Sequence, residues 1–130
     1  LKKNIAFGKD ESEIDKKKLF DVIKKSNLNK FLKNLPRGLN TFLGERGLKI
    51  SGGQRQRITI ARSIYNDPSI IIFDEATNAL DAITEEKIID EILKLKKEKT
   101  LIFVTHRTNN LKKFDFVYEV VNYKLRKKII

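Results

Sequence analysis

The sequence contains no cysteine, no methionine and no tryptophan among its 130 residues. Without cysteine, disulfides and thiolate metal sites are excluded. Only two prolines occur, and 40% of the residues are hydrophobic, which is typical of an ordered globular segment rather than a disordered one. No apolar run approaches the roughly 20 residues that a membrane-spanning helix needs. Any membrane attachment is therefore expected to come from another segment or another chain.

A phosphate-binding loop is also missing from the sequence. The motif G-x-x-x-x-G-K-[ST] occurs at none of the six glycines. Gly8-Lys9 comes nearest, but Lys3 stands at the place of the first glycine and Asp10 at the place of the hydroxyl residue. Because the chain begins at Leu1 and its strongest motifs normally follow such a loop, we expect an internal or C-terminal fragment of a longer protein.

Basic residues outnumber acidic ones, at 28 to 17, and give a net charge of +11. A nucleic acid or an anionic membrane surface is one interpretation of such a charge. The lysines are instead scattered, as in residues 16–18 and 94–99, without interleaved aromatic residues. We interpret them as solvated helix faces and expect no nucleic-acid partner.

The first half of the chain has helical patterns separated by polar breaks. Ser12-x-x-Asp15 indicates a capping box, before a helix whose apolar stripe includes Ile14, Leu19 and Val22. A short helix over residues 30–34 is expected to end before Pro36, because the residue before proline is pushed out of the helical region. A glycine-rich loop over 37–49 leads to a helix that begins near Gly52 and ends at Asn66-Asp67-Pro68.

The second half alternates strand and helix patterns. Residues 70–73 form a continuous apolar run bounded by turn signals, which predicts a strand covered on both faces. A helix over 83–97 and a second buried strand over 101–104 follow, and a strand–helix–strand order implies parallel pairing. Two further strands, over 116–121 and 125–130, are expected to form a hairpin. The fold class is therefore α/β, with a helical segment in front.

The segment Ser51-Gly52-Gly53-Gln54 lies where the middle helix begins. Glycine lets the backbone approach an anion closely, the free amides of the first turn point at the anion, and the helix dipole favours negative charge there. An ordinary turn and cap would look the same. The strand that ends in Asp74-Glu75 favours the phosphate-binding interpretation.

Asp74, Glu75 and His106 follow the two buried strands. In an open α/β sheet, ligands bind at the carboxyl ends of the strands, so these side chains are expected to share one edge. Successive strand residues point to opposite faces, which gives the two carboxylates different roles. Asp74 would hold Mg²⁺ through a water, and Glu75 would act as the general base on an attacking water. His106, the only histidine, is placed to hold a phosphate oxygen and that water.

Several motifs occur in an order that resembles the nucleotide-binding domain of ATP-binding cassette (ABC) transporters. They are Ser51-Gly52-Gly53-Gln54-Arg55-Gln56-Arg57, Ile60-Ala61-Arg62, Phe73-Asp74-Glu75-Ala76-Thr77, Ala79-Leu80-Asp81 and Thr105-His106-Arg107. The resemblance covers nearly all of the chain. It implies a P-loop NTPase (RecA-like) parallel-sheet core, of which this is the C-terminal part, preceded by the ABC α-helical subdomain. The implied division is 1–68 for the helical subdomain and 69–130 for the core.

The resemblance also implies residue roles. Ser51, Gly52, Gly53 and Gln54 would form the signature that contacts the γ-phosphate of ATP bound to the opposite protomer. Asp74 would end the Walker B strand, and Glu75 would be the catalytic carboxylate. Asp81 would be the D-loop aspartate that crosses the dimer interface, and His106 the switch histidine.

Two segments resemble the exporter type. They are Asn4-Ile5-Ala6-Phe7-Gly8 and Gly44-Glu45-Arg46-Gly47, and by resemblance Glu45 and Arg46 would touch the membrane domain. Importer ATPases and soluble translation or repair ATPases typically have Asp-Glu-Pro where this chain has Asp74-Glu75-Ala76. Three departures occur: Asn78 replaces the usual D-loop serine, Ile50 the usual leucine, and Asn122-Tyr123 a glycine-containing turn. None removes a charged catalytic group.

The sequence is therefore expected to be part of an exporter-type ATPase that uses ATP and Mg²⁺. Its expected partners are a second nucleotide-binding domain, in a head-to-tail dimer, and a transmembrane domain at the cytoplasmic face of the membrane. By the same resemblance, a lipid, lipid-linked oligosaccharide or polysaccharide is the expected class of cargo. Two alternatives stay open: a soluble ABC ATPase acting on nucleic acid or the ribosome, and a truncated interaction module without catalysis. The isolated chain is expected to be inactive, because the phosphate loop is missing.

Overall fold

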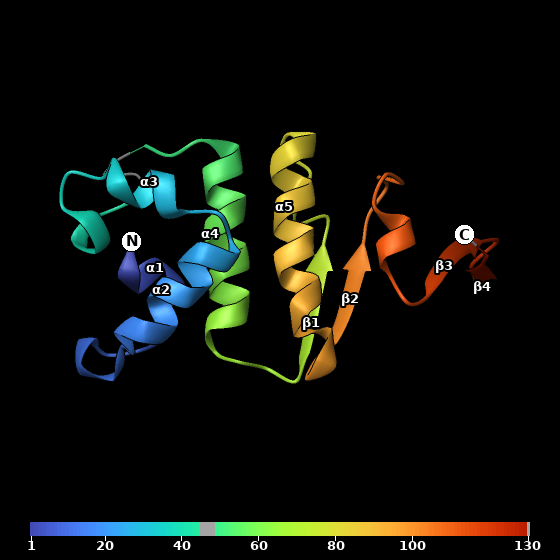
Figure 1. Ribbon diagram of the computed structural model, residues 1–130, viewed down its shortest axis with the longest axis horizontal. Helices are drawn as coiled ribbons and strands as arrows, with labels where there is room; N and C mark the ends of the chain where they lie inside the picture. The colour runs from blue at the N-terminus through green and yellow to red at the C-terminus, as the bar shows by residue number, and fades with distance from the viewer. Residues whose placement is uncertain (45–48, 130) are drawn as a thin grey trace.

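The computed structural model describes residues 1–44 and 49–129. Its N-terminal half is helical, with α1 (Lys2–Ile5), α2 (Lys16–Lys25), α3 (Asn29–Lys33) and α4 (Gly52–Tyr65), together with short 3₁₀ turns at Glu11–Glu13 and Gly38–Asn40. Helix α4 packs against α1 and α2. Figure 1 shows these helices at one end of the molecule, with the N-terminus among them and the C-terminus at the other end. A helical segment in front of an α/β part is thus confirmed.

The start of α2 differs from the prediction. Asp15, not Ser12, is the N-cap of α2, and its side chain accepts the backbone N–H of Lys18 at 3.1 Å. Ser12 lies within the preceding 3₁₀ turn, where Glu13 accepts the N–H of Asp10 at 2.9 Å. Several cap-forming residues stand within a few positions here, and the spacing alone selected the wrong pair.

The second half contains β1 (Ile70–Asp74), α5 (Ala82–Leu93) and β2 (Thr100–Val104). Strands β1 and β2 pair in parallel, with Ile72 opposite Ile102 and Asp74 opposite Val104. The pattern predicted as one helix over 83–97 divides into α5 and a 3₁₀ turn, η3 (Lys94–Lys97). Among the residues that the structure describes, no helix is both long and apolar enough to cross a membrane. The predicted α/β class and parallel pairing are confirmed.

The core lies on one face of this strand pair. Ile71 and Phe73 of β1 are buried in a cluster with Ile88 and Ile92 of α5, and the cluster continues into the helical segment. On the opposite face, Ile70 and Ile72 are 58% and 63% exposed. Ile102 and Val104 of β2 are exposed as well. The predictions that β1 is covered on both faces and that β2 is a buried strand are therefore wrong for the described part of the chain, because no described element packs on that side.

The last two strands form the predicted hairpin. Strands β3 (Val117–Val121) and β4 (Lys124–Lys128) pair antiparallel, in a sheet separate from β1 and β2. Asn122 and Tyr123 form the turn with φ values of 48° and 61°, which suits a two-residue hairpin turn in which both central residues are left-handed. The hairpin lies beyond β2, on the side away from the helical segment (Figure 1).

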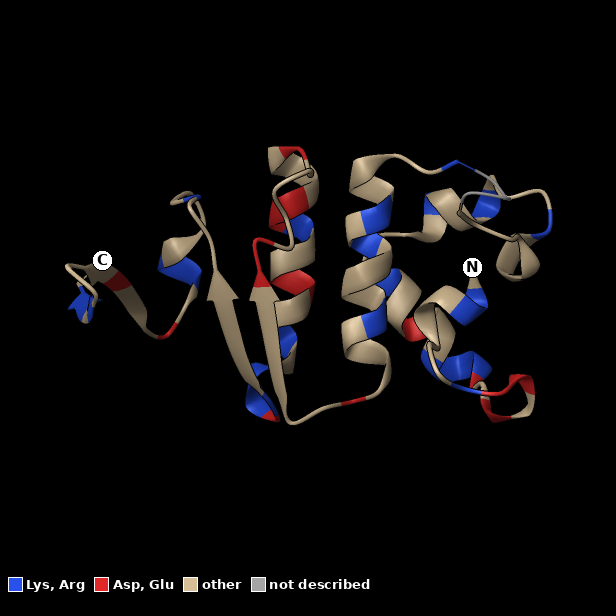
Figure 2. Ribbon diagram, turned by 180° about the vertical axis from the view of Figure 1, so that it is seen from behind, with Lys and Arg blue, Asp and Glu red and all other residues tan. Residues whose placement is uncertain are grey.

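Charge is distributed unevenly over the fold. Lysine and arginine lie on the helices, around the lower end of the strand pair and on the C-terminal hairpin, whereas acidic residues lie on α5, at the carboxyl end of β1 and on the loop between α1 and α2 (Figure 2). The basic residues thus lie on many elements rather than on one. This arrangement is consistent with the interpretation of the lysines as solvated faces.

Candidate functional site

Glu75 and His106 meet at the carboxyl ends of the two parallel strands. His106 Nε2 lies 2.8 Å from Glu75 Oε1, and the side chains are 88% and 41% exposed. Glu75 has φ 45°, a left-handed conformation that is uncommon for a residue with a side chain. Its backbone N–H donates to Val104 O at 2.9 Å, which ties the end of β1 to β2. The shared strand edge expected from the sequence is present, and an accessible carboxylate stands there beside an imidazole.

Asp74 is the last residue of β1 and is exposed. Mg²⁺ is commonly held by one or two carboxylates together with waters and phosphate oxygens, so Asp74 fits as a single ligand. Within residues 1–44 and 49–129, no group of three or more His, Cys, Asp or Glu side chains is arranged to hold a metal ion. A single carboxylate such as Asp74 is compatible with a metal whose other ligands are phosphate oxygens and water.

The signature segment begins α4 with a reciprocal cap. Ser51 is the N-cap, and its Oγ accepts the N–H of Gln54 at 3.2 Å, while Gln54 Oε1 accepts the N–H of Ser51 at 2.8 Å. Ser51 still has its O–H to donate, and the first-turn N–H groups of Gly52 and Gly53 lack partners within the helix. This helix end thus presents donors of the kind that bind phosphate oxygens.

The first turns of α4 touch the loop that follows β1. A Cβ placed on Gly53 would come within 3.2 Å of Ala79 O, so only glycine allows this approach without a shift. Gln56 Oε1 accepts the N–H of Ala79 at 2.8 Å. The signature helix is therefore attached to the loop between Glu75 and α5, a contact that the sequence did not predict.

Asp81 ends this loop and caps α5. Its carboxylate accepts the N–H of Thr84 at 2.9 Å, and hydrogen bonding from Thr84 holds the pKa of Asp81 below its ordinary value. The side chain is thus ionised and fixed at the helix start. Its expected role at a dimer interface stays a prediction.

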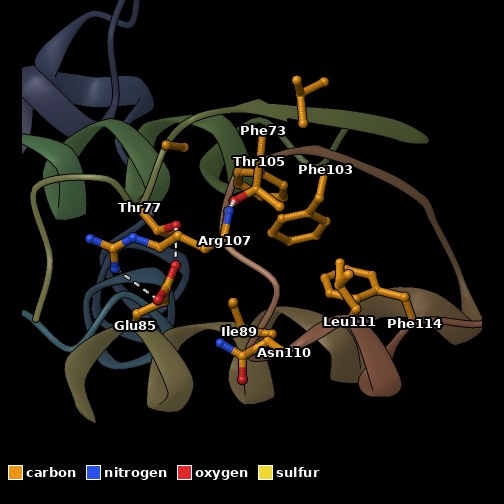
Figure 3. A pocket seen from close by; sticks show the side chains of 12 residues that line it. Phe73, Thr77, Glu85, Ile89, Phe103, Thr105, Arg107, Asn110, Leu111 and Phe114 are labelled. Atoms are coloured by element: carbon orange, nitrogen blue, oxygen red, sulfur yellow. Dashed lines mark hydrogen bonds and ion pairs between the residues drawn. The ribbon is translucent and has the colours of Figure 1, made fainter. Parts of the chain in front are cut away.

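A buried network lies beneath the same loops. Glu85 is 2% exposed, and its carboxylate accepts Thr77 Oγ1 at 2.7 Å and Arg107 Nη1 at 2.8 Å. Figure 3 shows these three side chains at one end of a small pocket, with Phe73 and Phe103 further along it. Sequence patterns alone assign no role to Glu85 or Arg107. The only signal was the position of Arg107 directly after His106.

Two predicted contact residues, Glu45 and Arg46, lie outside the described residues. Their proposed contact with a membrane domain stays a prediction. The other predicted site residues, Ser51 to Gln54, Asp74, Glu75, Asp81 and His106, lie at the ends of α4, β1 and β2 and at the start of α5.

Comparison with known proteins shows what the chain is similar to. Residues 1–78 match the family described as ABC transporter. The chain is 42% identical over 123 residues to an ABC transporter ATP-binding protein, YwjA, of Bacillus subtilis. It is 44% identical over 119 residues to an ATP-dependent lipid A-core flippase of Pseudoalteromonas translucida. These alignments cover 94% and 92% of the chain, but only 21% and 20% of the relatives.

A solved structure agrees with the sequence matches. The chain superposes on a bacterial Atm1-family ABC exporter with ATP bound, with a TM-score of 0.82 and 35% sequence identity, over 95% of the chain and 21% of the exporter. The chain thus spans about a fifth of the length of the proteins that it matches. A flippase and an exporter among them favour the exporter interpretation over the soluble alternative.

Proposed function

Because the chain belongs to the ABC transporter family, as part of an ATP-binding domain of the exporter type, we propose that it supplies hydrolytic and signature residues to an ATPase that drives export across a membrane. The observation that carries the proposal is the Glu75–His106 pair, 2.8 Å apart at the carboxyl ends of two parallel strands. A base and a polar ring meet there at an accessible edge, where α/β folds bind ligands.

In the proposed reaction, Glu75 accepts a proton from a water while the water oxygen attacks the γ-phosphorus of ATP. The bond from the γ-phosphorus to the ADP oxygen breaks, and phosphate leaves. His106, beside the Glu75 carboxylate, helps to orient the water and a γ-phosphate oxygen. Asp74 would hold Mg²⁺ through a water, and the bound metal would offset the negative charge of the phosphates.

The signature is proposed to act on a second ATP. Ser51 to Gln54 would contact the γ-phosphate held by a partner ATP-binding domain, and Asp81 would lie near that interface, so two domains would close head to tail around two nucleotides. The phosphate-binding loop is proposed to come from sequence outside these 130 residues.

Assembly with a membrane domain completes the proposal. The helical part, residues 1–68, would face that domain at the cytoplasmic side of the membrane, with Glu45 and Arg46 in contact with it, and residues 69–130 would belong to the ATP-binding core. A lipid or lipid-linked oligosaccharide is the proposed cargo, supported by the similarity to a lipid A-core flippase.

The test is the Glu75→Gln substitution in the complete exporter that carries this chain. Glutamine keeps the size and hydrogen bonding of the side chain but accepts no proton, so phosphate release should fall on the order of 10² to 10⁴-fold. ATP binding should persist, and the closed dimer should accumulate. Glu98→Gln, at an exposed carboxylate after α5, is the matched control. Near-normal phosphate release from the Glu75 variant would contradict its role as base.

A further inference from the structure

A closed circuit of contacts joins the loops that follow β1 and β2. Glu75 Oε1 lies 2.8 Å from His106 Nε2, and Glu75 Oε2 accepts the Asn78 side-chain N–H at 2.5 Å. The backbone oxygen of Asn78 in turn accepts Arg107 Nη2 at 2.9 Å. Arg107 directly follows His106 in the chain, so the circuit closes. Each oxygen of the Glu75 carboxylate is therefore held by one of the two loops.

The guanidinium of Arg107 is fixed by further partners. Its Nη1 donates to Leu80 O at 3.1 Å and to the buried carboxylate of Glu85 at 2.8 Å. Glu85 also accepts the hydroxyl of Thr77 (Figure 3). Arg107 thus reaches two backbone oxygens of the loop, Asn78 O and Leu80 O, from a position set by α5. Its planar group presents these donors in a fixed fork.

Glu75 combines an uncommon backbone conformation with a half-exposed side chain. With φ 45°, the residue occupies a sparsely populated backbone region, which persists only where surrounding contacts impose it. A half-exposed glutamate side chain otherwise samples several rotamers, and fixing it costs conformational entropy. The two carboxylate contacts select one orientation, with Oε1 toward His106.

We propose that Asn78 and Arg107 are positioning residues that hold the Glu75 carboxylate against His106. The proposal rests on the proposed function of Glu75 as base. Asn78 contacts Glu75 through its side-chain N–H, whereas the serine found at this position in the resembling family has a shorter side chain without an amide. Arg107 acts one step further away, because it fixes the backbone of Asn78.

The geometry is testable in the 130-residue chain without ATP. His106 is the only histidine, so its ring ¹⁵N signals are unambiguous in an NMR spectrum. The Glu75 carboxylate, whose Oε1 lies 2.8 Å from Nε2, favours the tautomer with the proton on Nε2. Asn78→Ala and Arg107→Lys should shift the neutral ring toward the other tautomer. Arg107→Lys keeps a charge beside Glu85 but removes the fork that reaches Asn78.

The matched control is Asn109→Ala, at an exposed asparagine of the loop after β2. It should leave the tautomer signals of His106 unchanged. Wild-type tautomer signals in both Asn78→Ala and Arg107→Lys, with the fold intact by the remaining amide spectrum, would overturn the proposal. Asn78 is exposed, so its variant tests the circuit even if Arg107→Lys is less stable.

The kinetic arm uses the complete exporter. A small misplacement of a reacting group costs up to about 10²-fold in rate, and we expect Asn78→Ala to lower kcat by about 10-fold or more while KM for ATP stays constant. In a Glu75→Gln background the same change should have no further effect, because residues that act through one group are non-additive. Equal losses in both backgrounds would overturn the positioning role.

A Glu75→Gln exporter with normal phosphate release would instead refute the proposed function, and the NMR experiment would still test the geometry of Glu75 and His106.

Discussion

Removing Arg107 is expected to destabilise the 130-residue chain through Glu85. The side chains of Arg107 and Glu85 are 34% and 3% exposed, and they are 2.8 Å apart. In Arg107→Ala, a buried carboxylate keeps only the hydroxyl of Thr77 as a partner. Removal of one partner from a buried ion pair costs about 3–5 kcal/mol. Because Arg107 is one-third exposed and water reaches the vacated space, we expect the lower end, about 3 kcal/mol.

The assay is urea unfolding followed by circular dichroism at neutral pH. Arg107→Lys should lose less stability than Arg107→Ala, because a positive charge remains beside Glu85. The double variant Arg107→Leu/Glu85→Leu should recover most of the loss, since apolar replacement of a buried pair is often neutral or better.

An Arg107→Ala cost below about 1 kcal/mol, the value for exposed pairs, would refute the assignment of Glu85 as a buried charge held by Arg107. If the double variant is as unstable as Arg107→Ala, the unpaired charge of Glu85 is not the cause of the instability. In that case lost packing, not the orphaned carboxylate, would explain the effect.

Three further predictions follow from the site. Ser51→Arg in the complete exporter should retain ATP binding but lose hydrolysis, because a large side chain blocks the helix end that meets the partner's nucleotide; lost binding in a folded variant would contradict the trans role. Asp81→Ala should destabilise the chain at neutral pH, and less so in acid. Hydrogen bonding from Thr84 lowers the pKa of Asp81 in the folded chain. The stabilisation by the Asp81 carboxylate is therefore present above the unfolded pKa and is lost as the pH falls through the folded pKa. Unfolding curves at several pH values check this, and a pH-independent loss would refute it. The isolated chain, which has no phosphate loop, should bind a fluorescent ATP analogue poorly and hydrolyse none; micromolar affinity with turnover would contradict this.

The helices and strands of the core were largely predictable, because their signals are local. The apolar spacing of α4 and the continuous apolar run of β1 can each be recognised within a short stretch of sequence. The start of α2 was misassigned, since adjacent residues compete for the cap. The cover on β1 was also misjudged. An apolar run shows that a strand needs apolar cover on both faces, but it does not show whether the same chain provides the covering element.

The candidate site was predictable at the strand ends and not between the loops. Glu75 and His106 follow apolar strands, and parallel pairing brings such ends together. Glu85 stands beside another glutamate on an amphipathic helix and looks like a solvated residue. Its burial depends on Arg107, which lies 22 positions away in the sequence. No local pattern contains that information.

The open face and edges of β1 and β2 affect how the chain behaves in concentrated solution. Ile70, Ile72, Ile102 and Val104 are exposed there. Within residues 1–44 and 49–129, each of these two strands pairs only with the other, and unpaired strand edges are templates for pairing with another chain. The net charge of +11 opposes such encounters through mutual repulsion. Salt screens that repulsion, with a Debye length of about 8 Å at physiological ionic strength. Colloidal stability of the 130-residue chain therefore depends on low salt, and aggregation should increase as ionic strength rises.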